Sequence, residues 1–108
     1  MPTIKLLIPK KRDVTISKRY QTSFYNSSAW RGSRKKKGLR QLKFERNPVC
    51  ERCEAKGLTV LTAEVHHKIP WETGLTEDQR WYLFTLWENL ESLCVPCHHK
   101  AENKLRHQ

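Results

Sequence analysis

L-C-V-P-C-H-H, residues 93–99, and the shorter run C-E-R-C, residues 50–53, decide the fold of this chain. Two cysteines that lie two residues apart can bind one tetrahedral zinc ion, and two such pairs fill its four positions. An ion with four protein ligands has no position left for a substrate, so we expect a structural zinc. Its predicted ligands are Cys50, Cys53, Cys94 and Cys97. Disulfides are the alternative, but close C-x-x-C pairs without an export signal favour metal.

The length of 108 residues predicts one small domain. A chain of this size buries roughly two-thirds of its unfolded surface, so a bound metal is a common source of extra stability. Between the cysteine pairs lie the 40 residues 54–93, more than the roughly 15–20 of a simple zinc ribbon, so this interval must fold. We expect neither a membrane span nor a secretory signal, because the apolar run near the start already ends at Pro9.

Positive charge is concentrated in the first half of the chain. Of the 21 Lys and Arg residues, 14 lie in residues 1–46, which contain only two acidic residues. In residues 47–108, seven basic residues face nine acidic ones. Runs of charged residues usually belong to the solvated surface. These runs alternate with aromatic residues, which favours a polyanion as the binding partner. We therefore predict a basic arm, residues 1–19, joined to a globular part, with nucleic acid as the partner.

The spacing of apolar residues predicts helices in the first half. A short strand is expected within the basic arm, and a short helix within Tyr20–Trp30. This helix is expected to dock by Phe24, Tyr25 and Trp30. From Leu39 the pattern fits another helix, which should end near Asn47-Pro48 because the residue before a proline resists the helical conformation.

The second half predicts a ββα unit. After a zinc-knuckle-like loop at 48–57, the β-branched stretch 58–69 indicates a strand, with a break. The capping-box sequence at 76–79 indicates a short amphipathic helix. A second strand is predicted at 90–94, followed by a helix from Pro96 to Lys104. The aromatic residues expected in the core are Trp71, Trp81, Phe84 and Trp87, although Trp71 is also a candidate for stacking on a base.

The histidines are the candidate catalytic residues. His66 and His67 are neighbours on an extended segment, so their side chains diverge and one can bind a metal while the other faces the substrate. His98 follows a zinc-bound cysteine and can supply a second ligand to the same ion. Glu102, one helical turn further on, can reach that ion or pair with Arg106. Two protein ligands leave positions for water and phosphate, as in an open catalytic site.

These residues resemble the HNH endonuclease family. The resemblance rests on C-E-R-C, then E-V-H-H-K-I-P, then W-E-N-L-E-S-L-C-V-P-C-H-H-K, and it covers roughly residues 20–104. More narrowly, the chain is similar to the small zinc-containing HNH proteins of tailed phages and prophages. The resemblance implies an α+β chain with the small ββα-metal (His-Me finger) nuclease fold, N-terminal helices and a structural zinc held by four cysteines. It also implies a nuclease domain at residues 20–108 behind the arm.

The resemblance implies a role for each motif residue. His67 matches the general base that activates water, and Asn89 matches the residue that orients this base through a backbone contact. His66 stands where the family often has a metal-binding Asp, and His98 matches the second metal ligand. Histidine at position 66 makes the site less anionic, which favours softer divalent ions over magnesium. The expected catalytic ion is therefore a divalent metal such as Mg²⁺, Mn²⁺, Ni²⁺ or Zn²⁺.

The implied function is hydrolysis of DNA phosphodiester bonds by a one-metal mechanism, nicking one strand or cutting both. The residues expected to bind DNA are Arg31, Arg34, Lys35, Lys36, Lys37 and Lys100. Small phage proteins of this kind often act with terminase and portal in genome packaging, which implies a place in the cytoplasm of a bacterial host. Two other hypotheses remain at this point, a non-catalytic zinc-stabilised DNA-binding protein and a protein that binds or cleaves RNA.

Overall fold

The fold was derived from a computed structural model, which describes residues 16–106 and the side chains up to residue 102. The strand expected within the basic arm lies outside the described residues, as does His107. Within residues 16–106, no helix is both long enough and apolar enough to cross a membrane.

Two short antiparallel strands form the centre of the molecule. β1 (Glu64–His67) pairs with β2 (Leu90–Leu93), and the register sets His66 opposite Glu91 and His67 opposite Leu90. The strand predicted over 58–69 is therefore much shorter than expected. The first half of the predicted strand pairs with another part of the chain, since the N–H of Thr62 donates to the carbonyl of Pro48 at 2.9 Å. These backbone groups pair with the cysteine loop instead of extending the sheet.

Three helices precede the sheet: α1 (Lys18–Tyr25), α2 (Ser28–Arg31) and α3 (Leu39–Arg46). The single helix predicted within Tyr20–Trp30 is in fact two, because the chain turns at Asn26 and Ser27. The N–H of Asn26 closes α1, and Ser27 takes an extended conformation as the N-cap of α2. The prediction for α3 is confirmed, with its end just before Asn47-Pro48.

The remaining elements are α4 (Glu51–Ala55), η2 (Trp71–Thr73), α5 (Glu77–Thr85), η3 (Trp87–Asn89) and α6 (Val95–Arg106). The predicted cap of α5 is confirmed, since the Thr76 hydroxyl accepts a hydrogen bond from the N–H of Gln79 at 3.2 Å. The predicted place of Pro96 in the first turn of the last helix is confirmed, since α6 begins at Val95, and a missing N–H costs nothing in that turn.

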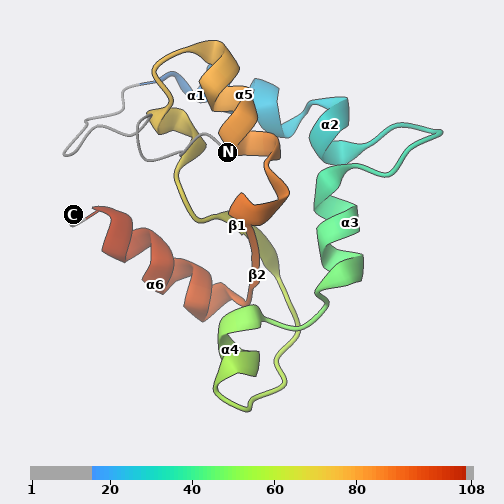
Figure 1. Cartoon of the computed structure of the whole chain (residues 1–108), viewed down its shortest axis with the longest axis vertical. Helices are drawn as coiled ribbons and strands as arrows, with labels where there is room; N and C mark the ends of the chain where they lie inside the picture. Colours follow the sequence, from blue (N-terminus) through green and yellow to red (C-terminus); the bar gives the residue numbers. More distant parts are fainter. Residues whose placement is uncertain (1–15, 107–108) are drawn as a thin grey trace.

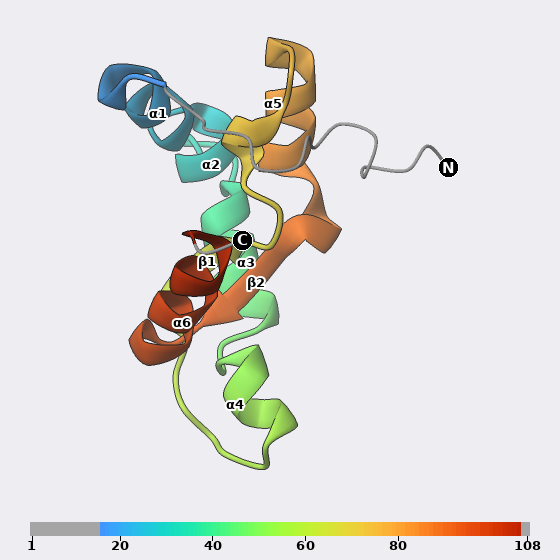
Figure 2. The ribbon, with the colours of Figure 1, turned by 90° about the vertical axis from the view of Figure 1, so that its left-hand side faces the viewer.

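The two strands and α6 form the predicted ββα unit. α6 contacts β1, α4 contacts β2, and α3 contacts both strands. Figures 1 and 2 show α6 and α4 at the lower end of the molecule, with α1, α2 and α5 gathered at the other end. The α+β class predicted from the sequence is confirmed.

The core is divided between these two ends. The larger cluster is aromatic, and Phe24 stacks between Trp71 and Trp81 with ring centres 4.2 Å and 3.9 Å away. The smaller cluster contains the cysteines, Leu93 and Ala101. Trp71 is 1% exposed, so the hypothesis that it stacks on a nucleic-acid base is wrong. Tyr25 packs on Trp30 and Phe84 as expected, with ring centres 5.8 Å and 5.2 Å away, although it stays 38% exposed.

Candidate active site and metal centres

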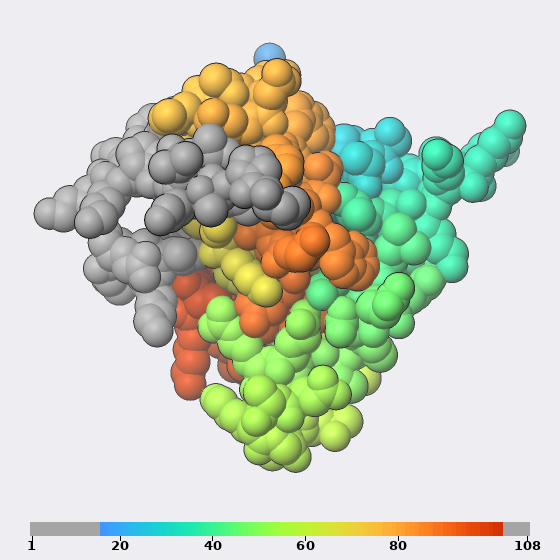
Figure 3. Space-filling model, in the orientation of Figure 1, coloured from blue at the N-terminus to red at the C-terminus, as the bar shows by residue number. Residues whose placement is uncertain are grey.

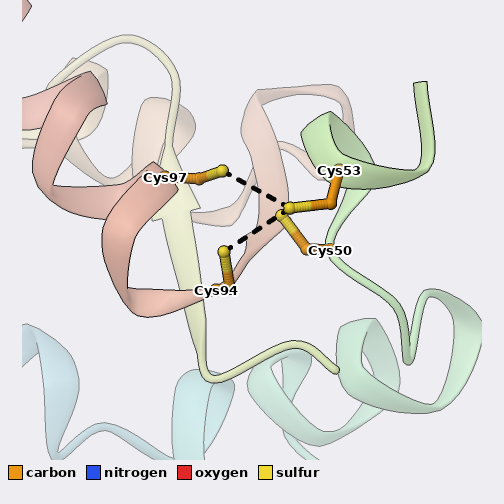
Figure 4. A group of neighbouring side chains, drawn as sticks. All are labelled: Cys50, Cys53, Cys94 and Cys97. Carbon is orange, nitrogen blue, oxygen red and sulfur yellow. Dashed lines mark hydrogen bonds between the residues drawn. The ribbon is translucent and has the colours of Figure 1, made fainter. Parts of the chain in front are cut away.

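The four cysteines lie together at the lower end of the molecule. α4 carries Cys53 and has Cys50 as its N-cap, while Cys94 and Cys97 belong to the end of β2 and the first turn of α6. All four sulfur atoms lie within 4.8 Å of one another, and Figure 4 shows them pointing toward one another from α4 and α6. None is in a disulfide. The sequence prediction that these residues share one cluster is therefore confirmed.

The spacing of the sulfur atoms fits a tetrahedral zinc ion. The Sγ atom of Cys53 is 3.7 Å from that of Cys94 and 3.7 Å from that of Cys97. A zinc–sulfur bond of about 2.3 Å places the sulfurs of a regular tetrahedron roughly 3.8 Å apart. A disulfide would require about 2.05 Å. The cluster is therefore compatible with a structural zinc.

A polar network joins the loop that carries Cys50 and Cys53 to the sheet. Arg52 donates two hydrogen bonds of 3.1 Å to the carboxylate of Glu91 on β2. The carboxylate of Glu51 accepts the N–H of Ser92 at 2.7 Å and pairs with Lys43 of α3 at 3.1 Å. Because Glu91 faces His66 across the sheet, the loop that holds the cysteines also supports the strand that carries the histidines.

His66 and His98 meet beside the sheet. His66 lies on β1, His98 lies on the first turn of α6, and their ring centres are 5.1 Å apart. Two imidazoles that share an ion at about 2.1 Å have ring centres roughly 4.5–5.2 Å apart at bond angles near 90–109°. His66 is buried, and this burial, together with nearby His98, lowers its pKa. The pair suits a divalent ion, which prefers neutral imidazole.

Two carboxylates flank His98. Its Nδ1 atom is 3.2 Å from an oxygen of Glu64, and its Nε2 atom is 3.2 Å from an oxygen of Glu102. A neutral imidazole carries one N–H, so it can donate to only one of them, and the other nitrogen is free to bind a cation. Glu64 was missed at the level of sequence. It lies two residues before His66, and strand alternation could have placed the two on one face.

His67 lies on the opposite side of the strand, within the aromatic cluster. Its ring stacks on Phe84, with centres 4.9 Å apart, and on Trp30, with centres 5.2 Å apart. The Nε2 atom is 3.0 Å from the carbonyl oxygen of Phe84. A carbonyl can only accept a hydrogen bond, so Nε2 carries the proton and Nδ1 keeps a free lone pair. Burial lowers the pKa of His67 to about 4, which keeps the ring neutral near pH 7.

Asn89 holds the segment that follows His67. Its side-chain oxygen accepts the N–H of Ile69 at 2.8 Å, and its amide nitrogen donates to the carbonyls of Ile69 at 3.0 Å and Leu83 at 2.9 Å. The backbone oxygen of Asn89 accepts the N–H of Lys68 at 2.8 Å. Asn89 therefore joins the backbone just after β1 to the backbone of α5, and its hydrogen bonds go to backbone groups rather than to the His67 ring.

The histidines line one pocket of about 690 Å³. Among the further residues of its wall are four polar ones that the sequence analysis did not place in the site: Gln21, Tyr25, Glu64 and Glu72. Tyr25 accepts a hydrogen bond from the Trp71 indole at 3.0 Å, and burial raises its pKa to about 12. Glu72 pairs with Gln21 at 3.3 Å, and burial raises the pKa of its carboxyl. The sequence spacing between α1 and the motif did not indicate that residues of α1 would line this pocket.

The basic residues predicted to bind DNA occupy two places. Arg34, Lys35 and Lys36 lie on a loop between α2 and α3 that is closed by a bridge between Gly32 and Lys37. Figures 1 and 3 show this loop projecting from the body of the molecule. The side chain of Lys37 pairs with Glu45 at 2.9 Å, so part of its charge is neutralised. Of the other predicted residues, Arg31 lies at the end of α2 and Lys100 is exposed on α6.

Comparison with known proteins identifies the class. The sequence model described as HNH endonuclease matches residues 50–104, about half of the chain. The fold is similar to the crystal structure of the deep-sea thermophilic bacteriophage GVE2 HNH endonuclease with manganese ion. The TM-score is 0.61 at 24% sequence identity, over 86% of this chain and 100% of that chain. No match was found among curated proteins.

The ββα unit thus belongs to a nuclease fold. The chain belongs to the HNH endonuclease family, whose members are metal-dependent nucleases. The resemblance noted from the sequence motifs and the expected fold are both confirmed.

Proposed function

We propose that the protein is a DNA endonuclease in which His67 is the general base and His66 and His98 hold the catalytic ion. The observation that carries the proposal is the arrangement of the three rings. His66 and His98 lie with ring centres 5.1 Å apart, while the Nε2 atom of His67 is fixed on the Phe84 carbonyl at 3.0 Å. Both environments open into the same pocket.

In this proposal His67 takes the proton. Its Nδ1 atom accepts a proton from a water molecule as the oxygen of that water attacks phosphorus, and the hydrogen bond to Phe84 steadies the imidazolium that forms. General-base catalysis of this kind is typically worth about 10²–10⁴-fold in rate. A divalent ion bound by His66 and His98 would supply positive charge for the phosphoryl oxygens and for the departing 3′ oxygen.

The carboxylates and Asn89 serve as positioning residues. Glu64 accepts the N–H of His98, in the manner of the carboxylates that orient metal-binding histidines in other proteins. Glu102 is placed to join the ion from the other side of the His98 ring. Asn89 fixes the end of β1 and therefore the backbone from which His67 projects.

The identity of the ion follows from the ligands. Two imidazoles, with one or two carboxylates nearby, suit Mn²⁺, Ni²⁺ or Zn²⁺ at least as well as Mg²⁺. The similar phage enzyme was crystallised with manganese. We propose Mn²⁺ as the first ion to test, and zinc as the ion of the cysteine cluster.

The biological setting is proposed from the family resemblance. A phage or prophage origin, action in the bacterial cytoplasm, and cooperation with terminase and portal in genome packaging are consistent with the phage protein of similar fold. We also propose that residues 20–108 form the nuclease domain, with residues 1–19 as a basic arm.

The test is cleavage of a supercoiled plasmid. Purified protein is incubated with the plasmid and with Mg²⁺, Mn²⁺, Ni²⁺ or Zn²⁺, each with and without EDTA. We expect nicked or linear DNA that depends on the added ion. Intact plasmid under every ion, despite retained DNA binding, would contradict the proposal and favour the non-catalytic DNA-binding alternative.

A further inference from the structure

A second pocket adjoins the histidine site. It has a volume of about 870 Å³ and, unlike the first, it contains no acidic residue among its lining side chains. Its polar lining consists of Asn26, Arg31, Arg40 and Gln41 beside the aromatic residues Tyr25, Trp30 and Phe44. We call this pocket the arginine groove.

The arginine groove and the histidine pocket share a wall. Tyr25 lines both of them. Trp30 lines the groove while its ring stacks on His67 with centres 5.2 Å apart. Ala63 lines the groove, and the next residue, Glu64, lines the histidine pocket. A molecule that leaves the histidine pocket past Tyr25 therefore enters the groove directly.

The junction of α2 with α3 brings the two arginines together. Arg31 is the last residue of α2 and Arg40 is the second residue of α3. Gly38 permits this close approach, because a Cβ atom at that position would lie only 2.1 Å from the carbonyl oxygen of Trp30. Gly32 completes the turn with a φ of +87°, a conformation that favours glycine.

The charges of the groove are available for a ligand. Two other basic side chains of this region are paired, Lys37 with Glu45 at 2.9 Å and Lys43 with Glu51 at 3.1 Å. Within residues 16–102, no carboxylate forms an ion pair with Arg31 or Arg40. The guanidinium of Arg40 instead lies over the ring of Phe44, 4.6 Å from its centre, which limits its freedom and leaves its charge uncompensated.

We infer that the arginine groove binds the sugar-phosphate backbone of the strand that is being cut, beside the scissile phosphate. This inference rests on the proposed nuclease function. Successive phosphates of one strand step about 3.4 Å along the duplex axis, so a strand with one phosphate beside His67 brings its next phosphates past Tyr25 to the arginines. The groove thereby sets the direction of the strand through the site, and the histidine pocket is left to bind the ion.

The inference is tested by the salt dependence of binding. Binding of a fluorescent duplex is measured by anisotropy at increasing salt, with zinc-loaded protein and no added catalytic ion. Each phosphate contact contributes about 0.9 to the slope of log K against log salt concentration. We expect Arg31→Ala and Arg40→Ala each to lower the slope by about 1, and the double variant by about 2. Lysine at both positions should restore the slope.

The matched control is Lys56→Ala, which removes an exposed positive charge at the end of α4, away from the groove. Its slope should equal that of the wild type. Because Arg31 and Arg40 are exposed, their variants should keep the wild-type zinc content and circular dichroism. In cleavage assays they should raise KM and leave kcat and Mn²⁺ affinity unchanged.

Phosphate binding by the groove and the proposed nuclease function are contradicted by different results. A wild-type slope in the double variant would overturn the inference that the groove binds phosphates. An equal loss of slope in Lys56→Ala would overturn it too. Absence of cleavage by the wild type under every ion would overturn the proposed function instead, and the slopes would still decide whether the groove contacts phosphates.

Discussion

Two adjacent histidines have different surroundings because strand alternation sends them to opposite sides of β1. His66 meets His98, whose two ring nitrogens each lie beside a carboxylate, a polar setting that suits a cation. His67 enters the aromatic cluster, where burial lowers its pKa to about 4 and the Phe84 carbonyl fixes its tautomer. In the proposed function, one dipeptide thus supplies both a metal ligand and a general base.

The proposed base gives the first prediction. His67→Ala should abolish cleavage, because no other imidazole of residues 16–102 lies on the Phe84 carbonyl, while zinc content and Mn²⁺ affinity stay close to those of the wild type. Plasmid nicking, zinc analysis and Mn²⁺ titration measure the three properties. His99→Ala is the matched control, since His99 is exposed on α6, and it should cleave normally. Wild-type turnover by His67→Ala would refute the assignment.

The second prediction concerns Glu64, which accepts the N–H of His98 in the proposed site. Glu64→Ala should weaken Mn²⁺ binding by about 10–100-fold, the usual effect of removing the carboxylate that orients a metal-binding histidine. Electron paramagnetic resonance of free Mn²⁺ measures the affinity directly. Glu54→Ala removes an exposed carboxylate on α4 and should have no effect. Equal affinities for wild type and Glu64→Ala would exclude this role.

At the scale of single residues, the sequence predicted the motif side chains and missed their partners. His66 and His98 could be paired because both belong to a recognisable motif, and the structure brings them together. Tyr25 and Gln21 belong to α1, about 40 positions earlier, and nothing in their spacing connects them to β1. Only the packing of α1 on the aromatic cluster places them in the pocket wall.

At the scale of the elements, the side chain of Asn89 fixes the position of the segment between β1 and η2. Asn89, in η3, makes three hydrogen bonds to the backbone at Ile69 and Leu83, and it is 3% exposed. It therefore joins the end of β1 to the end of α5, whose Phe84 carbonyl holds His67.

Asn89→Ala is the third prediction. It should lower the free energy of unfolding by about 2–4 kcal/mol, because buried backbone groups at Ile69 and Leu83 lose their partners. Cleavage should fall even at temperatures where the variant remains folded, since the base is no longer held. Urea denaturation followed by tryptophan fluorescence gives the stability. Its neighbour supplies the control, Glu88→Ala, and a similar loss there would remove the special role of Asn89.

Helix boundaries were better predicted than strand boundaries, for a physical reason. The cap at Thr76 and the stop before Pro48 are local, so sequence reveals them. The stretch 58–63 has β-branched residues, yet it is held by backbone hydrogen bonds to the cysteine loop, including one from Cys50 to the Val60 carbonyl at 2.6 Å. Pairing with the cysteine loop overrides strand propensity there, and propensity alone does not reveal it.

For the whole molecule, the two ends have separate tasks. The sulfur cluster links α4 to the start of α6, and the aromatic cluster packs α1 and α5 around His67. Structural zinc contributes about 10–16 kcal/mol in small domains, as much as the whole stability of a domain this size. The charge asymmetry of the sequence has a counterpart in the projecting basic loop and the arginine groove at the end of α2.

Cys97 and His98 are neighbours in the chain but belong to different ion sites in the proposed function, so substituting each in turn separates the structural role of zinc from hydrolysis most directly. Zinc content, thermal unfolding and plasmid cleavage are measured for both variants. We predict that His98→Ala keeps one zinc per chain and the wild-type melting temperature, yet loses at least about 10²-fold in cleavage. Cys97→Ser should lose its zinc and its cooperative unfolding transition. Full cleavage by His98→Ala, or a stable zinc-free Cys97→Ser, would contradict the account.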